Sequence, residues 1–424
     1  MEIDLAVATG LSVAGYCIDN RQWRYTILSL CRGKLLSYVR TSSQNQIHIL
    51  HLLMNIVPVK LIFLLARIAC FAYRHNLSVP TYLTIALVRA FLTTFTPYQI
   101  QFLLPSTSKT CESWLKRQSH SSFPFRTALS LHSYPLLRSG GMIHWFTSNH
   151  DFSINETRKD KVLLFFHGGG YAVPLTPSHL DWCLAHLHSA RRCSTNLHIV
   201  VLEYSLAPKL RYPTQLSQAA EALHTILQRG FLLRDIIIGG DSAGGNLTFA
   251  LLGHLLHPHP DPKVVKIKIE EPLAGAFGIS PWVSMDSSAP SFSHHQISDM
   301  LSQRLIRQSA QDYLGDTSAA AELKKGNWWS MPGDAEVDWW SGLGRVTRRV
   351  YLNVGTNEMF YDHVLGLAAR LMEVCNANMG QWVDVKLDIG IGESHDQVLT
   401  DFIRGQREGR AVKSLMGWME GALL

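Results

Sequence analysis

Short apolar runs, bounded by glycine, proline and polar residues, recur along the chain from residue 142 onwards. Each run is short and apolar enough to be a strand that is buried on both faces of a sheet. The runs lie at residues 142–146, 161–166, 198–203, 235–239, 276–282, 349–354 and 382–389. Segments with helical spacing lie at residues 216–227, 246–256, 362–374, 396–404 and 412–423. Strands that alternate with helices predict a mainly parallel sheet covered by helices on both faces.

The most apolar stretch of the chain precedes these strands, at residues 47–73. A helix of this length would span a bilayer, but Pro58, Lys60 and Arg67 interrupt it. A charge near the middle of a span costs about 2.5–3.5 kcal/mol on insertion scales. Three interpretations stay open: an interfacial helix, a spanning anchor, and a helical lid packed on the rest of the chain. A second apolar stretch, at residues 81–104, fits a cap or core helix better than a membrane segment.

We therefore expect three regions along the chain. Residues 1–45 form a leader of unclear structure, residues 46–122 hold the apolar helical segment and a polar linker at 105–122, and residues 123–424 form the domain built on the sheet. Residues 299–345 resemble a partly helical insertion in that domain. Its tryptophans either pack a loosely built section or form a wall of an apolar pocket. They are Trp328, Trp329, Trp339 and Trp340.

Composition and charge narrow the classes of partner. Of the 424 residues, 46% are hydrophobic and 17% are charged, which is the balance of a folded chain rather than a disordered one. The net charge of +6 is uneven, because residues 1–120 carry 12 Lys or Arg against 4 Asp or Glu and the remainder is near neutral. Nucleic-acid binding therefore has little support, whereas the basic, apolar N-terminal part suits a membrane surface. The oligomeric state is left open.

Cysteine and histidine usage favours an intracellular chain that needs no metal. Seven cysteines are spread from Cys17 to Cys375 without a C-x-x-C pair, so we expect mostly reduced thiols and a cytoplasmic or endoplasmic-reticulum-membrane-associated protein. His254, His257 and His259 are close in sequence, but Pro258, Pro260 and Pro262 break any regular face there. We interpret them as part of a solvated loop rather than a metal cluster, and we expect no cofactor.

The sequence Gly-Asp-Ser-Ala-Gly-Gly, at residues 240–245, follows one of the buried strands and precedes a helix. A strand, a tight turn and a helix are the context of a nucleophile elbow, in which a serine stands exposed at the tip of the strand. Gly240 and Gly244 flank Ser242 at positions where a β-carbon would clash in so sharp a turn. The pattern predicts Ser242 as a nucleophile.

A second glycine motif, His-Gly-Gly-Gly at residues 167–170, ends the strand at 161–166. Such a run arises by chance in only about 0.003 of chains of this length, judged from average composition. Consecutive glycines let a backbone turn its N–H groups towards a neighbouring site. In an acyl-transfer enzyme such donors stabilise the oxyanion of the tetrahedral intermediate. We predict the N–H groups of Gly168, Gly169 and Ala243 as these donors.

A serine nucleophile needs a base, and the base needs a carboxylate that orients it. In this type of fold the order along the chain is serine, acid, histidine. His395 follows the last predicted strand and is predicted as the base, while His167 is interpreted as a support for the glycine loop. Glu358 follows the strand at 349–354 in a polar turn, and we predict it as the acid. Asp362, in the first turn of the next helix, is the alternative, although a carboxylate there also suits the helix dipole.

These motifs together resemble the hormone-sensitive lipase, or G-D-x-G, family of α/β-hydrolases. The matching pieces are residues 167–171, 204–208, 240–246, 280–282, 358–362 and 395–396. Two departures are Ser205, where the family usually has arginine, and Glu358, where aspartate is common. The second departure keeps Asp362 open as the acid.

The resemblance implies an α/β-hydrolase fold with a helical N-terminal cap and a serine carboxylesterase acting on small to medium apolar esters, such as acetyl esters. The apolar N-terminal segment and the Ser-Pro-Trp sequence at 280–282 are similar to fungal steryl-acetyl-hydrolase-like proteins and to esterases of fungal biosynthetic clusters. That similarity implies a role in secondary metabolism. The alternative is a protein that binds or rearranges a small molecule without hydrolysis, because a fold and its site do not fix the reaction.

Overall fold

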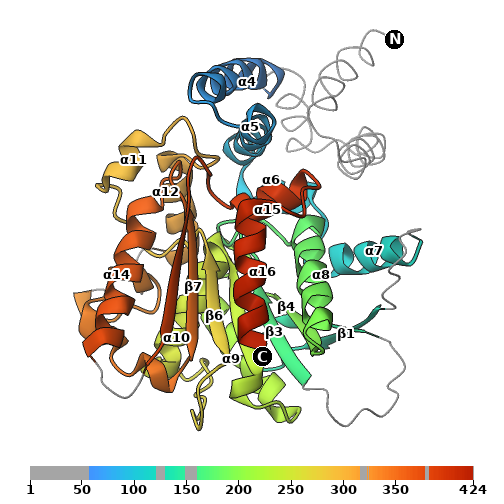
Figure 1. Cartoon of the computed structure of the whole chain (residues 1–424), viewed down its shortest axis with the longest axis vertical. Coiled ribbons are helices and arrows are strands. Elements are labelled where there is room, and N and C mark those ends of the chain that lie inside the picture. Colours follow the sequence, from blue (N-terminus) through green and yellow to red (C-terminus); the bar gives the residue numbers. More distant parts are fainter. Residues whose placement is uncertain are drawn as a thin grey trace.

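An eight-stranded sheet forms the centre of the part of the chain that the structure describes, in the order β1-β2-β4-β3-β5-β6-β7-β8 (Figure 1). The computed structural model describes residues 57–120, 129–148, 160–315, 322, 324–377 and 382–423. The predicted leader at 1–45 and the start of the apolar run, residues 47–56, lie outside the described residues. The strands are β1 Leu129–Pro135, β2 Met142–Ser148, β3 Asp160–Phe166, β4 Asn196–Glu203, β5 Ile236–Asp241, β6 Gly275–Ile279, β7 Arg349–Gly355 and β8 Asp384–Gly390.

The sheet is parallel from β4 to β8 and antiparallel where β1 pairs with β2 and β2 with β4. This confirms the mainly parallel sheet predicted from the buried apolar runs, each of which forms a strand. Strand β1 was not predicted. It lies at the edge of the sheet and its side chains are half-buried or exposed, so it lacks the apolar run that marks a central strand.

Helices cover both faces of the sheet, as predicted. On one face α8 and α16 pack with the apolar side chains of β3, β4 and β7, and on the other face α9, α10 and α14 do so (Figure 1). The described α-helices are α4 Val57–Arg74, α5 Val79–Thr94, α6 Pro97–Leu103, α7 Thr107–His120, α8 Pro177–Arg192, α9 Thr214–Gln228, α10 Ser242–Leu256, α11 Pro290–His294, α12 Gln303–Leu314, α14 Tyr361–Ala377, α15 Gln397–Ile403 and α16 Arg410–Leu423. Short 3-10 turns lie at Leu233–Asp235, Pro332–Asp334, Val337–Trp340 and Leu343–Arg345.

Helix α7 occupies the stretch that was predicted as a polar linker. Its Trp114 is buried, and the indole Nε1 donates to Asp181 Oδ1 on α8 at 2.8 Å. Cys111 is also fully buried in the same cluster. The linker prediction was therefore wrong for residues 107–120, because two buried side chains dock an otherwise polar helix on the domain.

The N-terminal helices α4 and α5 pack on each other at one end of the sheet (top of Figure 1). Ile68 and Ala72 of α4 are buried together with Ile85 and Ala86 of α5. Met300, which follows β6, joins the same cluster. The two helices therefore contact the loops that leave the carboxyl ends of the strands, the edge at which ligands bind in open α/β sheets.

The tryptophans of the insertion pack against the far end of α10. Trp329 Nε1 donates to His257 O at 2.7 Å, and His257 Nε2 lies 2.8 Å from Trp339 O. His257 follows Ser242 by 15 residues, which is about 20 Å along a helix. Of the two interpretations, the structure supports packing rather than a pocket wall beside Ser242.

The histidines at the end of α10 do not form the solvated loop predicted for them. His254 and His259 are buried. His254 Nε2 lies 2.9 Å from Val265 O, and His259 Nε2 lies 3.1 Å from Tyr212 Oη and 3.0 Å from Glu322 Oε1. These side chains therefore tie the loop after α10 to its neighbours.

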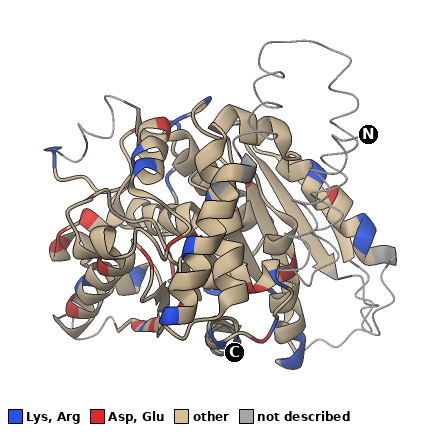
Figure 2. Ribbon diagram, turned by 90° about the horizontal axis from the view of Figure 1, so that it is seen from above, with Lys and Arg blue, Asp and Glu red and all other residues tan. Residues whose placement is uncertain are grey.

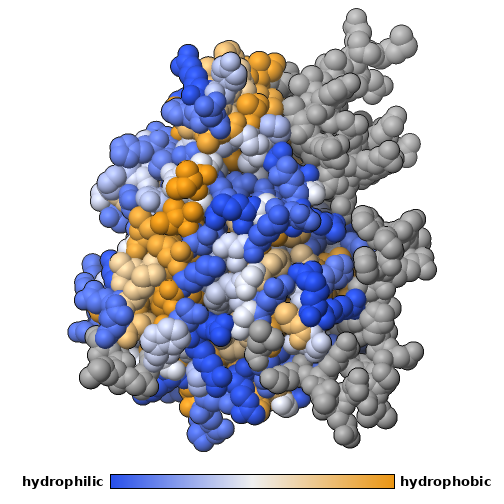
Figure 3. All heavy atoms as spheres, viewed as in Figure 1, coloured by the Kyte–Doolittle hydropathy of each residue, from blue (hydrophilic) through white to orange (hydrophobic). Residues whose placement is uncertain are grey.

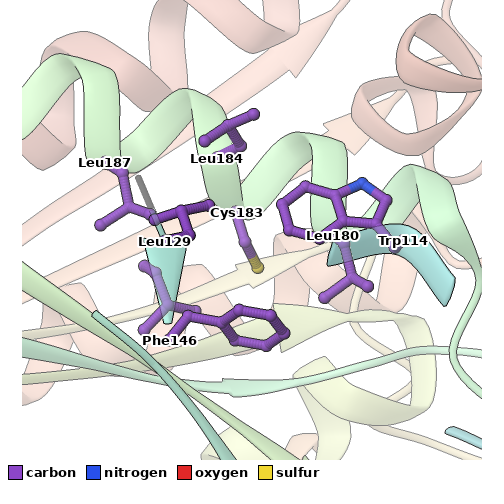
Figure 4. A pocket seen from close by; sticks show the side chains of 8 residues that line it. Trp114, Leu129, Phe146, Leu180, Cys183, Leu184 and Leu187 are labelled. Atoms are coloured by element: carbon purple, nitrogen blue, oxygen red, sulfur yellow. The ribbon is translucent and has the colours of Figure 1, made fainter. Parts of the chain in front are cut away.

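A small apolar pocket lies between α7, α8 and strands β1, β2 and β4 (Figure 4). It is lined by Trp114, Leu129, Phe146, Leu180, Cys183, Leu184, Leu187 and Ile199. Burial raises the pKa of the Cys183 thiol well above its usual range, which keeps it protonated and unreactive. None of the predicted site residues lines this pocket.

Candidate active site

The turn between β5 and α10 has the geometry of a nucleophile elbow. Strand β5 ends at Asp241, and Ser242 begins α10 with a φ of 48°. A β-carbon on Gly240 would lie 2.0 Å from Phe166 O, and one on Gly244 would lie 1.9 Å from the same atom. Only glycine fits at both positions, so the steric reason inferred from the sequence is present in the structure.

The predicted nucleophile and base lie side by side although 153 residues separate them in sequence. His395 Nε2 is 3.0 Å from Ser242 Oγ. His395 lies in the loop between β8 and α15, and the ring of Phe360 packs edge-on against its imidazole at 5.1 Å. Both side chains are buried.

Glu358 is the carboxylate that faces the other ring nitrogen of His395. Its Oε1 lies 3.8 Å from His395 Nδ1, longer than a hydrogen bond. Neither atom has another hydrogen-bond partner among the described residues. The second oxygen, Oε2, accepts from Ser280 Oγ at 2.7 Å and from Gly355 N at 3.1 Å. These two bonds fix the carboxyl group beside the imidazole.

Asp362, the alternative acid, is engaged elsewhere. It lies in the first turn of α14, and its Oδ2 accepts from the backbone N–H of Ser291 at 2.7 Å. The side chain is partly exposed, whereas Glu358 is fully buried. Of the two carboxylates, Glu358 is the one that the structure brings to His395.

The glycine loop after β3 differs from the prediction at one residue. The N–H of Gly168 donates to Asp241 Oδ1 at 3.0 Å. This contact overturns the predicted role of Gly168 as an oxyanion donor, because its N–H is already occupied. The N–H groups of Gly169 and Gly170 donate to no protein group within the described residues. Ala243 N lies in the first turn of α10, where N–H groups have no partner within the helix.

His167 holds the glycine loop in place through contacts with Gly168 and Tyr204. Its Nδ1 lies 2.8 Å from Gly168 O, and its ring stacks on Tyr204 with centroids 4.3 Å apart. The Tyr204 hydroxyl donates to His167 O at 2.7 Å. Burial lowers the pKa of His167 to about 4, so the imidazole is neutral at physiological pH. A neutral, stacked histidine agrees with the supporting role expected from the sequence.

Two further buried carboxyl groups surround the base, and neither was assigned a role from the sequence. Asp396 Oδ2 lies 3.3 Å from His395 Nε2. Asp299 accepts from Met359 N at 2.6 Å and from Leu301 N at 2.9 Å, next to the turn that carries Glu358. Asp396 could have been found from the sequence because it directly follows His395. Asp299 could not, because it lies in a loop with no local motif.

The electrostatics of this cluster favour a proton on the base. Burial alone would lower the pKa of His395, but the carboxyl groups of Asp396, Glu358 and Asp299 outweigh it and raise the pKa to about 10. Burial raises the pKa values of Asp396 and Asp299, while the positive charge of the protonated His395 lowers both. His395 and Asp396, whose Nε2 and Oδ2 atoms lie 3.3 Å apart, therefore titrate as one coupled pair.

Helix α5 contacts the loops that carry the base and the acid. The Tyr82 hydroxyl donates to Gly392 O at 3.0 Å and accepts from Asn357 Nδ2 at 2.7 Å. Arg89 Nη1 donates to the backbone oxygen of Asp299 at 2.8 Å. The N-terminal part of the chain is thus connected to the residues that flank His395 and Glu358.

Comparisons with known proteins agree with this geometry. A family model described as the alpha/beta hydrolase fold matches residues 163–396. The chain is 28% identical over 217 residues to an acetyl-hydrolase of Streptomyces hygroscopicus, a match that covers 50% of this chain and 63% of the relative. It is 30% identical over 129 residues to steryl acetyl hydrolase 1 of Saccharomyces cerevisiae, with 30% and 27% covered. Each match thus spans less than two thirds of the relative's own length.

A solved structure shows the same fold. The crystal structure of an esterase from the bacterial hormone-sensitive lipase family superimposes with a TM-score of 0.55 and 21% sequence identity. The match covers 80% of this chain and 95% of that one. Over the matched residues the two chains therefore share the same overall fold.

Proposed function

The chain belongs to the α/β-hydrolase fold family and is similar to its hormone-sensitive lipase branch, and from this premise we propose that it is a serine hydrolase of carboxylic esters. One observation carries the proposal: Ser242, on a strained turn at a strand tip, has its Oγ 3.0 Å from His395 Nε2. A nucleophile within hydrogen-bond reach of a base is the arrangement that covalent catalysis requires.

In the proposed mechanism His395 Nε2 takes the proton from Ser242 Oγ as the oxygen attacks the ester carbonyl. Glu358 orients the imidazole from its Nδ1 side. The backbone N–H groups of Gly169, Gly170 and Ala243 stabilise the oxyanion. His395 then protonates the leaving alcohol, and water releases the acyl group from Ser242 by the same route. Each step uses groups of the chain and water, so the mechanism calls for no metal or cofactor.

The proposed substrates are small to medium, uncharged, apolar esters with a short acyl group, such as acetyl esters. Two relatives are named for the removal of acetyl groups, an acetyl-hydrolase and a steryl acetyl hydrolase. Acidic and basic residues are interspersed along the ribbon in Figure 2, which favours no charged substrate class. A place in fungal secondary metabolism is proposed on the similarity of the N-terminal segment and residues 280–282 alone.

The first prediction concerns the nucleophile. Ser242→Ala should abolish hydrolysis of p-nitrophenyl acetate, with a loss of about 10⁶-fold in kcat, as when other serine hydrolases lose their nucleophile. A fluorophosphonate should form an adduct on Ser242 of the unchanged protein, detected by peptide mass spectrometry.

In a panel of esters, acetates should exceed long-chain and charged acyl esters in kcat/KM.

The matched control is Ser293→Ala, which removes an exposed hydroxyl that contacts only Pro290 O among the described residues. It should retain full activity and labelling. An unchanged kcat in folded Ser242→Ala protein would exclude the hydrolase mechanism, and a preference for long or charged acyl groups would exclude the proposed substrate class.

We also propose that the chain is intracellular and contacts a membrane surface through the helix within residues 47–73. The five described cysteines are free thiols, which fits a reducing compartment. Among the described helices, no single one is long and apolar enough to cross a membrane, and one sharply bent pair, Val79–Thr94 with Pro97–Gln118, passes by length and composition only. The support for an interfacial contact is the exposed apolar side of α4, whose test is given in the Discussion.

A further inference from the structure

Asp396 and Ser242 meet the same nitrogen of the base. Asp396 Oδ2 lies 3.3 Å from His395 Nε2, and Ser242 Oγ lies 3.0 Å from it. A neutral imidazole with its proton on Nδ1 has a lone pair at Nε2, which accepts from a serine hydroxyl but repels a carboxylate. With a proton at Nε2, the same nitrogen donates to the carboxylate and cannot accept from the serine. Asp396 and Ser242 therefore favour different protonation states of His395.

The structure holds Asp396 in this place. Its backbone has a φ of 51°, in the left-handed region, and its N–H donates to Ser280 Oγ at 3.0 Å. The same Ser280 hydroxyl donates to Glu358 Oε2. The position of Asp396 is thus fixed by the residue that also fixes the acid, so it is not set by adjacency to His395 alone.

The other carboxyl oxygen of Asp396, Oδ1, makes no hydrogen bond within the described residues. This oxygen is buried, and the residue is only 5% exposed. An unpartnered buried carboxyl oxygen is costly, and no cap bond from the Asp396 side chain to α15 offsets that cost. A purely structural role therefore explains this side chain poorly.

The groups around Asp396 and His395 carry an excess of acid. Glu358 faces them from the turn after β7, Asp299 from the loop before α12, and Asp241 from the end of β5. The Asp241 carboxyl group is shared with His179 at 3.2 Å. His295 lies within electrostatic range of Glu358 and Asp362, and Arg89 donates to the backbone oxygen of Asp299 rather than to its carboxylate.

We propose that Asp396 is a second carboxyl partner of the base, which holds a proton on His395 Nε2 in the resting enzyme and delays its use as a base until higher pH. This role rests on the proposed hydrolase function. In the resting enzyme the N–H at His395 Nε2 donates to Asp396 Oδ2. This proton must pass to solvent before Nε2 can take the proton of Ser242. Once that transfer occurs, Asp396 stabilises the imidazolium that forms, so the base is stronger but available only at higher pH.

The test is the pH profile of kcat/KM for ethyl acetate, followed by titrating the released acid. Removing a carboxylate next to an imidazolium should lower the apparent pKa of the base by about 1–3 units. Asp396→Asn should therefore shift the acidic limb of the profile to lower pH by that amount and reduce the alkaline plateau. Asp396→Glu should keep part of the upward shift.

The matched control is Asp401→Asn on α15, whose carboxyl group accepts from Gln397 Nε2 at 2.8 Å and has no contact with His395. Its acidic limb should stay where it is in the unchanged protein. An unmoved limb in folded, active Asp396→Asn enzyme would overturn the role proposed for Asp396 and leave the hydrolase function standing.

A second measurement does not depend on turnover. NMR titration of the His395 imidazole in the unchanged protein should show it protonated well above its ordinary pKa of about 6.5, and Asp396→Asn should lower that value. An ordinary titration in the unchanged protein would overturn the proposal even if the variant failed to fold. Loss of the hydrolase function would show separately, as a lack of fluorophosphonate labelling at Ser242.

Discussion

Glu358 reaches His395 from a turn that two hydrogen bonds hold in place. Ser280 Oγ and Gly355 N occupy one carboxyl oxygen and leave the other directed at His395 Nδ1. A glutamate is one methylene longer than an aspartate, so its backbone can sit further from the imidazole. The same role is filled by either residue type in this fold. Glu358 can therefore orient His395 although aspartate is common at this position in the family.

We predict that Glu358→Gln lowers kcat by about 10⁴-fold, the cost of losing the carboxylate in a serine triad. Asp362→Asn, its matched control, should lower kcat far less, because Asp362 bonds to the backbone of Ser291 instead. Both variants should be compared on p-nitrophenyl acetate after their folding is checked by circular dichroism. The reverse ranking would assign the role to Asp362.

At the scale of single residues, the sequence predicted what short motifs encode. Ser242 and His395 were predicted because each follows a predicted strand, and the structure places Ser242 Oγ 3.0 Å from His395 Nε2. Gly168 was mispredicted as an oxyanion donor because its partner, Asp241, is 73 residues away and takes its N–H. Asp299 was missed for a similar reason: it comes near His395 only through the folding of a loop that carries no motif.

At the scale of elements, α5 makes hydrogen bonds to the two loops that carry His395 and Glu358. Its Tyr82 hydroxyl connects Gly392, three residues before the base, with Asn357, the neighbour of Glu358. Desolvation by burial raises the pKa of Tyr82 to about 12, so the hydroxyl keeps its proton and can donate and accept at once. Tyr82 thus acts as a positioning residue for both loops.

We predict that Tyr82→Phe lowers kcat by up to about tenfold with little change in KM, because one hydrogen bond contributes about 0.5–1.5 kcal/mol. Steady-state kinetics on p-nitrophenyl acetate would measure the split. Tyr98→Phe on α6 is the control, since that ring is 61% exposed and its variant should behave as the unchanged protein. Equal kcat values for all three proteins would show that α5 is only a cover.

The elements that could be predicted from the sequence are those whose own residues are apolar enough to indicate that they are buried. Strands β3 and β5 are apolar runs buried almost throughout, and both were predicted. Strand β1 and helix α7 were not, because β1 is a partly exposed edge and α7 is polar except where Cys111 and Trp114 dock it. Tertiary contacts, rather than local pattern, decide such elements.

At the scale of the whole molecule, one of the apolar areas of the surface lies at the end that carries the site. The orange patch at the top of Figure 3 lies over α4. One side of this helix packs on α5 through Ile68 and Ala72. The opposite side exposes Val59, Ile62, Phe63 and Tyr73. A helix that is apolar on both sides is usually buried or in contact with lipid.

Charge supports a lipid surface as the contact. Arg67 and Arg74 are exposed on α4, seven residues apart and therefore on one side of the helix. A basic residue near an anionic membrane contributes about 1 kcal/mol to binding. Burying a side chain such as Ile62 or Phe63 in the interface adds about 1.5–3 kcal/mol each. Together these contributions suffice for reversible attachment next to the strand ends where apolar esters would enter.

The last prediction is that the chain binds vesicles of anionic phospholipid through α4. Replacing two exposed side chains together, Ile62→Gln and Phe63→Gln, should weaken co-sedimentation with such vesicles by at least about tenfold, since about 3 kcal/mol or more of apolar burial is lost. The activity on soluble p-nitrophenyl acetate should stay unchanged, because both side chains point away from α5. The control pair, Leu137→Gln and Trp382→Gln, removes apolar side chains elsewhere that are even more exposed, and it should leave binding intact. If the unchanged protein does not bind the vesicles, or the α4 variant binds as tightly, this side of α4 is not a membrane contact.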